Sequence, residues 1–223
     1  GTELAWEYAE AYQQPIIVVI NKLDRENADY NRTLESLRAS FHDYKFIPVM
    51  IPIGKEANFE GVVNLVSMKA YMGPGKDRSD LPANMQAEAE AARTALIEAA
   101  AEADDQLIEK YFSEGTLSNE EIRDGMRKAA KDSYLKTVPA FVTSGAKNVG
   151  TVPLMEALNV YVRPPAERRV RVIDAAGNED FLTAPQSDDG PLAAYVFKTV
   201  NDRFVGTLNF FRIFSGSIKS GGS

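Results

Sequence analysis

Three polar residues follow a short apolar run near the start of the chain, and their types could read a purine base. The run is Ile16–Ile20, and Asn21, Lys22 and Asp24 come directly after it. A carboxylate at position 24 can accept hydrogen bonds from the ring N1–H and the exocyclic amine of guanine, a pair that adenine does not offer. Such a site can reject the wrong base by about 10⁴–10⁵. The Lys22 stem can lie along the base, while Asn21 can hold the loop and reach the base edge.

A second polar loop follows another apolar run, Val138–Thr143, and could contact the same base. It reads Ser144, Gly145, Ala146, and its backbone N–H groups could hold the carbonyl oxygen that adenine lacks. In open parallel sheets, ligands lie at the carboxyl ends of the strands, where both loops are expected. Coincidence is the alternative: Asn-Lys-x-Asp would occur by chance in roughly 3% of chains of this length. Its place at the end of a buried strand makes coincidence rarer.

The chain has no phosphate-binding motif to accompany the two base loops. The motif G-x-x-x-x-G-K-[ST], whose amides and lysine cradle phosphates, does not occur. Asp174-Ala175-Ala176-Gly177 matches the D-x-x-G of a nucleotide switch only formally, because it follows both base loops instead of preceding them. The sequence therefore predicts the base half of a nucleotide site, with no catalytic residue and no metal ligand in this segment.

Composition excludes several other classes of function. The 223 residues include no cysteine, which excludes a disulfide framework and a Cys-ligated metal, and one histidine, His42, which disfavours a His-centred triad. A formal charge of −7 argues against a DNA-binding surface. The apolar runs are too short to span a membrane, and no signal peptide opens the chain. These features predict a soluble, cytoplasmic protein.

The order of the expected elements predicts an α/β fold. An amphipathic helix over residues 2–13 precedes the Ile16–Ile20 run, which fits a parallel strand buried on both faces. Another helix opens at Asn31 or Thr33, and helix–strand–helix order is typical of a doubly wound, mostly parallel sheet. The aromatic residues of the first helix are expected to pack in the core rather than stack on nucleic acid; these are Trp6, Tyr8 and Tyr12.

The pattern changes after Phe46, and this predicts an inserted subdomain. Pro48 and Pro52 interrupt an apolar segment, which indicates edge strands of a small separate sheet. A long Ala/Glu-rich helix is expected from Leu81-Pro82 to Tyr111 or Phe112. A further helix begins at a capping box of Ser118 and Glu121. The expected domains are 1–46 and 136–166 of one α/β domain, 47–135 as its α+β insert, 167–190 as a linker, and 191–223 as a truncated antiparallel β-barrel.

The chain resembles translation elongation factor G and its close paralogues over essentially its full length. The motifs that carry the resemblance are GTELAWEYAEAYQQPIIVVINKLDR, PIGKEANFEGVVNLVSMKAY, LIEAAAEADDQLIEKYF, LSNEEI, KNVGTVPLMEALNVYVRPP and DRFVGTLNFFRIFSGSIKSG. The resemblance implies the second half of a P-loop-type GTPase domain that binds GTP or GDP, with Asn21, Lys22 and Asp24 as its base-specificity motif. Ser144, Gly145 and Ala146 would form the second base loop. The family usually has Gly-Ser-Ala where this chain reads Thr143-Ser144-Gly145, which favours a divergent paralogue.

The resemblance also implies partners and a longer protein. The phosphate loop, the switches and the Mg²⁺ ligands would belong to the full-length protein, a monomer, and the fragment alone should be inactive. In the family, the insert contacts the ribosomal stalk protein, and other domains contact ribosomal RNA. Seven acids between Asn84 and Phe112 fit such a basic protein partner, although a solvated helix face explains them too. Alternative functions are a ribosome-binding homologue with weak or no hydrolysis, and a ribosomal-protection factor against tetracycline-type drugs.

Overall fold

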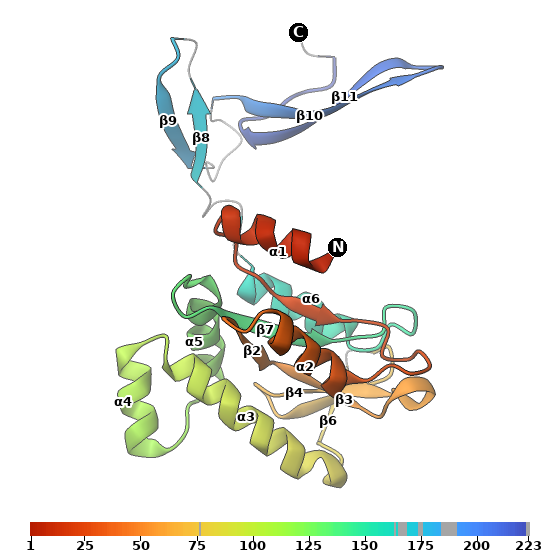
Figure 1. Ribbon diagram of the computed structural model, residues 1–223, viewed down its shortest axis with the longest axis vertical. Coiled ribbons are helices and arrows are strands. Elements are labelled where there is room, and N and C mark those ends of the chain that lie inside the picture. The colour runs from red at the N-terminus through yellow and green to blue at the C-terminus, as the bar shows by residue number, and fades with distance from the viewer. Residues whose placement is uncertain (76, 163, 165–168, 174–175, 184–190, 222–223) are drawn as a thin grey trace. The chain divides into compact units, whose positions relative to one another are not determined.

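The computed structural model describes residues 1–75, 77–162, 164, 169–173, 176–183 and 191–221. The chain forms two compact units, Gly1–Val162 and Arg163–Ser223, and each is described by itself (Figure 1). The elements of the first unit are, in chain order, α1 (Thr2–Ala11), β1 (Val18–Ile20), α2 (Tyr30–Ser40), β2 (Lys45–Pro48), β3 (Met50–Ile53), the 3₁₀ turn η1 (Glu56–Asn58), β4 (Gly61–Asn64), β5 (Lys69–Met72), β6 (Arg78–Ser79), the 3₁₀ turn η2 (Ala83–Met85), α3 (Gln86–Ala101), α4 (Asp105–Glu114), α5 (Asn119–Lys131), β7 (Thr137–Val142) and α6 (Thr151–Tyr161).

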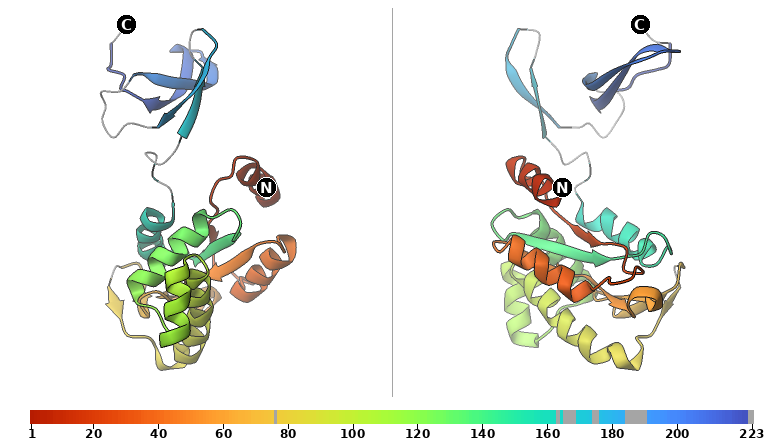
Figure 2. Two further views of the ribbon diagram at one scale, coloured as in Figure 1. Left: turned by 90° about the vertical axis from the view of Figure 1, so that its left-hand side faces the viewer. Right: turned by 45° about the vertical axis from the view of Figure 1, so that its right-hand side comes forward.

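A parallel sheet with the strand order β1-β7-β2 lies at the centre of the first unit. Ile20 pairs with Val142, so β1 and β7 end level with each other at the same edge. Helices α1 and α2 lie on one side of this sheet, and α5 and α6 lie on the other (Figure 2). The α/β fold class is confirmed, and so is the prediction that the two apolar runs share a sheet.

Strand β1 differs from the expectation that it is buried on both faces. It begins only at Val18, and Val19 is 39% exposed while Ile20 is buried. The reason is its position: within the described chain β1 has β7 as its one neighbour, so it forms an edge of the sheet. Continuous apolar sequence indicated a strand, but it did not indicate how many neighbours cover it.

The second sheet is antiparallel and has the order β3-β4-β5-β6. Val49 joins the two sheets, because its N–H donates to Ala140 of β7 and its carbonyl accepts from Leu65. Pro48 and Pro52 both lie in edge strands, as their missing N–H groups require. The insert boundary predicted between residues 46 and 47 falls within β2, which belongs to the parallel sheet. The other domain boundaries stay predictions.

The long helix expected over residues 81–112 is wrong, because the chain turns between α3 and α4. The Asp104 side chain accepts a hydrogen bond from the Gln106 N–H at 3.0 Å and caps the start of α4. An aspartate in this role stabilises a new helix start in preference to a continued helix. Lys128 of α5 pairs with the same carboxylate and holds the turn against the following helix.

The core prediction for α1 is correct for one aromatic residue and wrong for two. Trp6 is buried and stacks on Phe41, with ring centroids 4.0 Å apart. Tyr8 and Tyr12 are exposed, and so is Leu4 of the same stripe. The spacing identified a common face of the helix, but no residue of the first unit covers that face.

The start of α5 is the capping box that the sequence predicted. The Ser118 side chain accepts from the Glu121 N–H at 3.3 Å, and the Glu121 carboxylate accepts from the Ser118 N–H at 2.8 Å. Lys110 of α4 donates to the same carboxylate at 2.8 Å. The Lys110 hydrogen bond has the largest effect on this carboxyl, and together with the bonds from Ser118 it lowers the pKa of Glu121 from 4.5 to about 2.

This shift predicts a pH dependence of folding stability. Since the folded state holds Glu121 ionised, its contribution is complete above about pH 4.5 and is lost as the pH falls toward about 2. Glu121→Gln keeps a capping side chain but cannot titrate. Urea denaturation at about pH 6 and about pH 3 should show a smaller loss of stability on acidification in the variant than in the wild type. Equal losses in both proteins would contradict this prediction.

The second unit consists of two antiparallel hairpins in its described part. One is β8 (Arg169–Ile173) with β9 (Glu179–Thr183), and the other is β10 (Ala193–Asp202) with β11 (Gly206–Ser215). The stretch 167–190 is therefore not a plain linker, since β8 and β9 lie within it. Asp202 forms the β10–β11 turn, where its carboxylate accepts from the Phe204 and Val205 N–H groups. Many apolar side chains of β10 and β11 are exposed.

Candidate functional site

The two polar loops that the sequence singled out lie side by side. Since β1 and β7 are adjacent and parallel, Asn21 and Thr143 leave the sheet at the same edge. The Thr143 N–H donates to the Ile20 carbonyl, and the Leu23 N–H donates back to the Thr143 carbonyl. Leu23, between these polar residues, turns into the core and is buried. The fold thus brings the two predicted base loops together.

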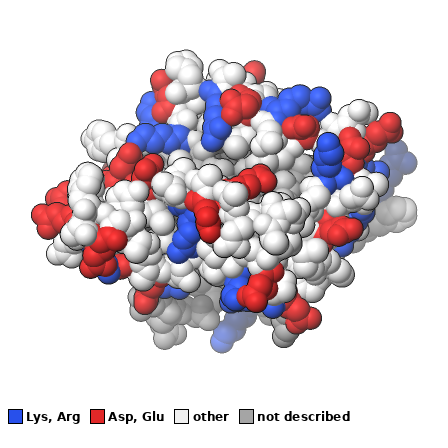
Figure 3. All heavy atoms as spheres, turned by 90° about the horizontal axis from the view of Figure 1, so that it is seen from below, with Lys and Arg blue, Asp and Glu red and all other residues white. Residues whose placement is uncertain are grey.

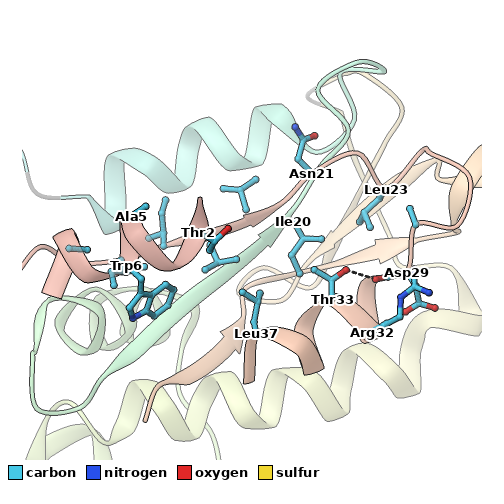
Figure 4. A pocket seen from close by; sticks show the side chains of 16 residues that line it. Thr2, Ala5, Trp6, Ile20, Asn21, Leu23, Asp29, Arg32, Thr33 and Leu37 are labelled. Carbon is cyan, nitrogen blue, oxygen red and sulfur yellow. Dashed lines mark hydrogen bonds between the residues drawn. The ribbon is translucent and has the colours of Figure 1, made fainter. Parts of the chain in front are cut away.

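Asn21 connects the two loops through one atom. Its side-chain oxygen accepts hydrogen bonds from the Lys22 N–H at 2.8 Å, the Gly145 N–H at 3.0 Å and the Thr143 hydroxyl at 3.2 Å. Figure 4 shows its side chain pointing toward the second loop. The backbone of Lys22 then has a φ of 64°, a left-handed conformation that few side chains adopt without such support. Asn21 therefore shapes both loops, and its amide nitrogen takes no part in this network.

Asp24 is the carboxylate between the two loops. The Ser144 hydroxyl donates to its Oδ1 at 2.6 Å, and the Asp24 side chain is only 9% exposed. That hydrogen bond lowers the pKa of Asp24 more than burial raises it, so the group stays ionised. Its Oδ2 lies 3.8 Å from the Arg25 Nε, longer than a hydrogen bond. The arrangement leaves acceptor capacity for a ligand.

Most backbone N–H groups of the second loop already donate hydrogen bonds within the protein. The fully buried Ser144 exchanges two backbone hydrogen bonds with Val149, and the Gly145 N–H is taken by Asn21. The Lys147 N–H donates to the Ser144 hydroxyl at 3.1 Å. Within the described chain, this leaves the Ala146 N–H as the loop amide without a hydrogen-bond partner. Of the amides proposed for a ligand oxygen, Ala146 is therefore the available one.

Three residues near the site had no predicted role: Asn27, Glu56 and Ala57. The Asn27 N–H donates to Glu56 Oε1 at 2.9 Å, and the Lys147 Nζ donates to the Ala57 carbonyl at 2.9 Å. Glu56 and Ala57 belong to η1, which sequence reasoning assigned to the insert. No spacing rule could have identified these contacts, because they join segments 29 and 90 residues apart.

A groove of about 550 Å³ runs along the free edge of β1, between α1 and α2 (Figure 4). Apolar side chains form most of its lining, including Trp6, Leu23 and Leu37. Asn21 lies at one end of the groove, but its amide oxygen is bonded to the second loop. The groove is thus an open flank of the sheet rather than a pocket around Asp24.

The remaining candidate features are possible metal sites, His42, the D-x-x-G match and membrane-spanning helices. In the described residues, no three or more His, Asp or Glu side chains gather where a metal ion could be held. His42 lies in the turn after α2 and is exposed. Asp174 and Ala175 of the D-x-x-G match lie outside the described residues. No helix in the described ranges is long and apolar enough to cross a membrane.

Comparison with known proteins shows a family and a structural likeness. The model of the family described as "Elongation factor Tu GTP binding domain" matches residues 1–164. A crystal structure of a protein from Thermus thermophilus is similar, with a TM-score of 0.76 and 26% sequence identity. The similarity covers 99% of this chain and 30% of the Thermus chain. This chain therefore spans about a third of the length of that relative.

Proposed function

Because this chain belongs to the family of the elongation factor Tu GTP-binding domain, and thus to the translational GTPases, we propose that it supplies the guanine-reading part of the nucleotide site. The observation that carries the proposal is the Asp24 carboxylate, fixed by Ser144 and held ionised at the edge where ligands of parallel sheets lie. Its oxygens would accept from guanine N1–H and N2–H. The Ala146 N–H would donate to the guanine carbonyl oxygen.

We propose that Lys22 and Asn21 complete this site. The exposed Lys22 starts from a left-handed backbone at the carboxyl end of β1, which suits a stem laid along one face of the base. The Asn21 oxygen is already occupied by three donors, so only its amide nitrogen remains for the base edge. Asn21 would thus act mainly by holding the loops, and Asp24 would provide the discrimination.

Phosphate binding and hydrolysis would come from other parts of a longer protein. Phosphoryl transfer relies on phosphate-cradling amides, a lysine and Mg²⁺, and the chain has no G-x-x-x-x-G-K-[ST] motif. The free edge of β1 and its apolar groove are where further strands of one GTPase sheet would continue. In this arrangement the present chain orients the nucleotide, and it contributes no group to the attack of water.

The proposed partners are those of a ribosome-associated factor that acts in the cytoplasm. Of the seven acids between Asn84 and Phe112, Glu102 pairs with Lys45 and Asp104 pairs with Lys128. Figure 3 shows acidic and basic side chains interspersed on the face seen from below. Asp105 and Glu109 of α4 are exposed and are the strongest remaining candidates for contact with a basic stalk protein. The sequence Thr143-Ser144-Gly145 supports a divergent paralogue.

Nucleotide binding tests the central proposal. In the full-length protein, GTP and GDP should bind at least about 10³-fold more tightly than ATP, because adenine leaves the Asp24 carboxylate without its two donors. Calorimetry with each nucleotide measures this ratio. The isolated 223-residue chain should bind GTP and GDP negligibly, since it lacks phosphate contacts. Equal affinity for ATP would overturn the proposal that Asp24 reads guanine. Micromolar GTP binding to the isolated chain would overturn the proposal that phosphate binding comes from other parts of a longer protein.

A further inference from the structure

The turn between β3 and β4 is stiff. The Asn58 N–H donates to the Lys55 carbonyl and the Phe59 N–H donates to the Glu56 carbonyl, both at 3.0 Å. Phe59 is buried in the core, which anchors the end of the turn. Gly54 opens it with a φ of +78°, and a Cβ there would lie 1.9 Å from the Asn58 carbonyl oxygen. The backbone of η1 is therefore fixed relative to the inserted sheet.

This stiff turn contacts both base loops. Glu56 accepts from the N–H of Asn27, three residues after Asp24, and the Ala57 carbonyl accepts from Lys147, three residues after Ser144. The Asn27 carbonyl also accepts from Arg32 at 2.6 Å, so the end of the first loop is held at both its N–H and its C=O. The two loops thus share a common support that belongs to the insert.

A continuous series of hydrogen bonds leads from the turn to the carboxylate of the site. Lys147 Nζ donates to the turn, and the Lys147 N–H donates to the Ser144 hydroxyl at 3.1 Å. The same hydroxyl donates to Asp24 at 2.6 Å. A shift of the turn would therefore change the position of the hydroxyl that orients Asp24. Pairing of β3 with β4 requires neither Glu56 nor Lys147, because it uses backbone groups.

We propose that η1 positions the guanine site, with Glu56 and Lys147 as positioning residues, and that the inserted sheet thereby sets the rate of nucleotide release. This inference rests on the proposed guanine site. Its consequence is regulation: a partner that displaces the β3–β4 hairpin loosens both base loops at once. Neither residue touches the base; each acts through the loop that it holds.

The experiment uses the full-length protein loaded with fluorescent GDP, and its readout is the release rate. Lys147→Met removes the amine and keeps the apolar stem, while Glu56→Ala removes the acceptor. Each should speed release about three- to tenfold, the effect of one lost hydrogen bond. Glu56→Gln keeps an acceptor for the Asn27 N–H and should release GDP at nearly the wild-type rate. Lys45→Met is the matched control, because it removes an amine bonded to Glu102 at 2.6 Å on an exposed surface.

A double variant separates a shared support from two local contacts. If the loops are connected through η1, either single change breaks the connection, and Glu56→Ala with Lys147→Met releases GDP hardly faster than the faster single variant. If the two rate effects multiply, or if Lys45→Met speeds release equally, the inference is wrong. Urea midpoints of all variants should match, which excludes general destabilisation as the cause.

Hydrogen exchange keeps the test independent of nucleotide affinity. In nucleotide-free protein, amides of residues 23–27 and 144–148 should exchange faster in Lys147→Met and Glu56→Ala than in wild type and Glu56→Gln. A wild-type protein without guanine-nucleotide binding would overturn the proposed function. Unchanged exchange in these two loops would overturn the positioning role of η1, whatever the protein binds.

Discussion

Replacing Asp24 with asparagine in the full-length protein is expected to lower GTP affinity by at least about tenfold and to shift its preference to xanthosine triphosphate. The Ser144 hydroxyl donates to one oxygen of Asp24, and the carboxamide oxygen can keep that place. The amide nitrogen then takes the other position and faces the N2 amine of guanine, donor against donor. Xanthine has an oxygen at that position and can accept from the amide. Competition binding with the two triphosphates measures the preference.

Asp29→Asn is the matched control for this change. Asp29 caps α2 by accepting from the Arg32 N–H at 2.7 Å, and asparagine caps helices about as well. The same chemical change at this nearby position should therefore leave the preference for GTP intact. If the Asp24 variant still prefers GTP, Asp24 does not read the base.

Gly150→Ala is expected to destabilise the first unit by about 2–5 kcal/mol. Gly150 precedes α6 with a φ of +74°, where an L side chain is strained. A Cβ there would lie 2.7 Å from the Val142 carbonyl oxygen and 3.0 Å from Val62 Cγ1. One contact is backbone and the other belongs to the buried β4, so neither neighbour can move freely. Urea denaturation followed by the fluorescence of Trp6, the single tryptophan, measures the loss.

Gly145 provides the comparison within the same loop. A Cβ at Gly145 would lie 3.8 Å from Asn21 Oδ1, an ordinary contact, and its φ is not in the left-handed region. Gly145→Ala should therefore change stability little, or raise it by up to about 1 kcal/mol through a less flexible unfolded chain. A loss in Gly145→Ala as large as that in Gly150→Ala would mean that the loop, rather than the geometry of Gly150, resists substitution.

The sequence predicted those parts of the site that follow from strand ends. Apolar runs that stop at Asn21 and Thr143 imply polar loops at one edge of the sheet, because parallel strands end at the same edge. It could not predict that Glu56 contacts Asn27 or that Lys147 contacts Ala57, since contacts between distant segments leave no local pattern. The same limit explains α1, where the spacing of Tyr8 and Tyr12 defined a face but not what covers it.

The break between α3 and α4 shows a different limit. The Ala/Glu-rich composition favours helix throughout, and the preference of Asp104 for a capping position was too weak a signal against that background. The hairpin β8–β9 was missed because charges and turn residues dominate its sequence, although the alternation Val170, Val172 is a strand pattern.

The pairing of β1 with β7 has a consequence for biosynthesis. Asp24 and Ser144 are 120 positions apart, and at about 5–20 residues per second the intervening chain takes roughly 6–24 s to emerge. During that interval β1, which precedes the Asn-Lys-x-Asp motif, has been synthesised, but its neighbour β7 has not. The Ser144–Val149 bridge closes the second loop only later still. A nascent or truncated chain that ends before Val149 would carry the complete Asn-Lys-x-Asp motif and yet have no formed guanine site.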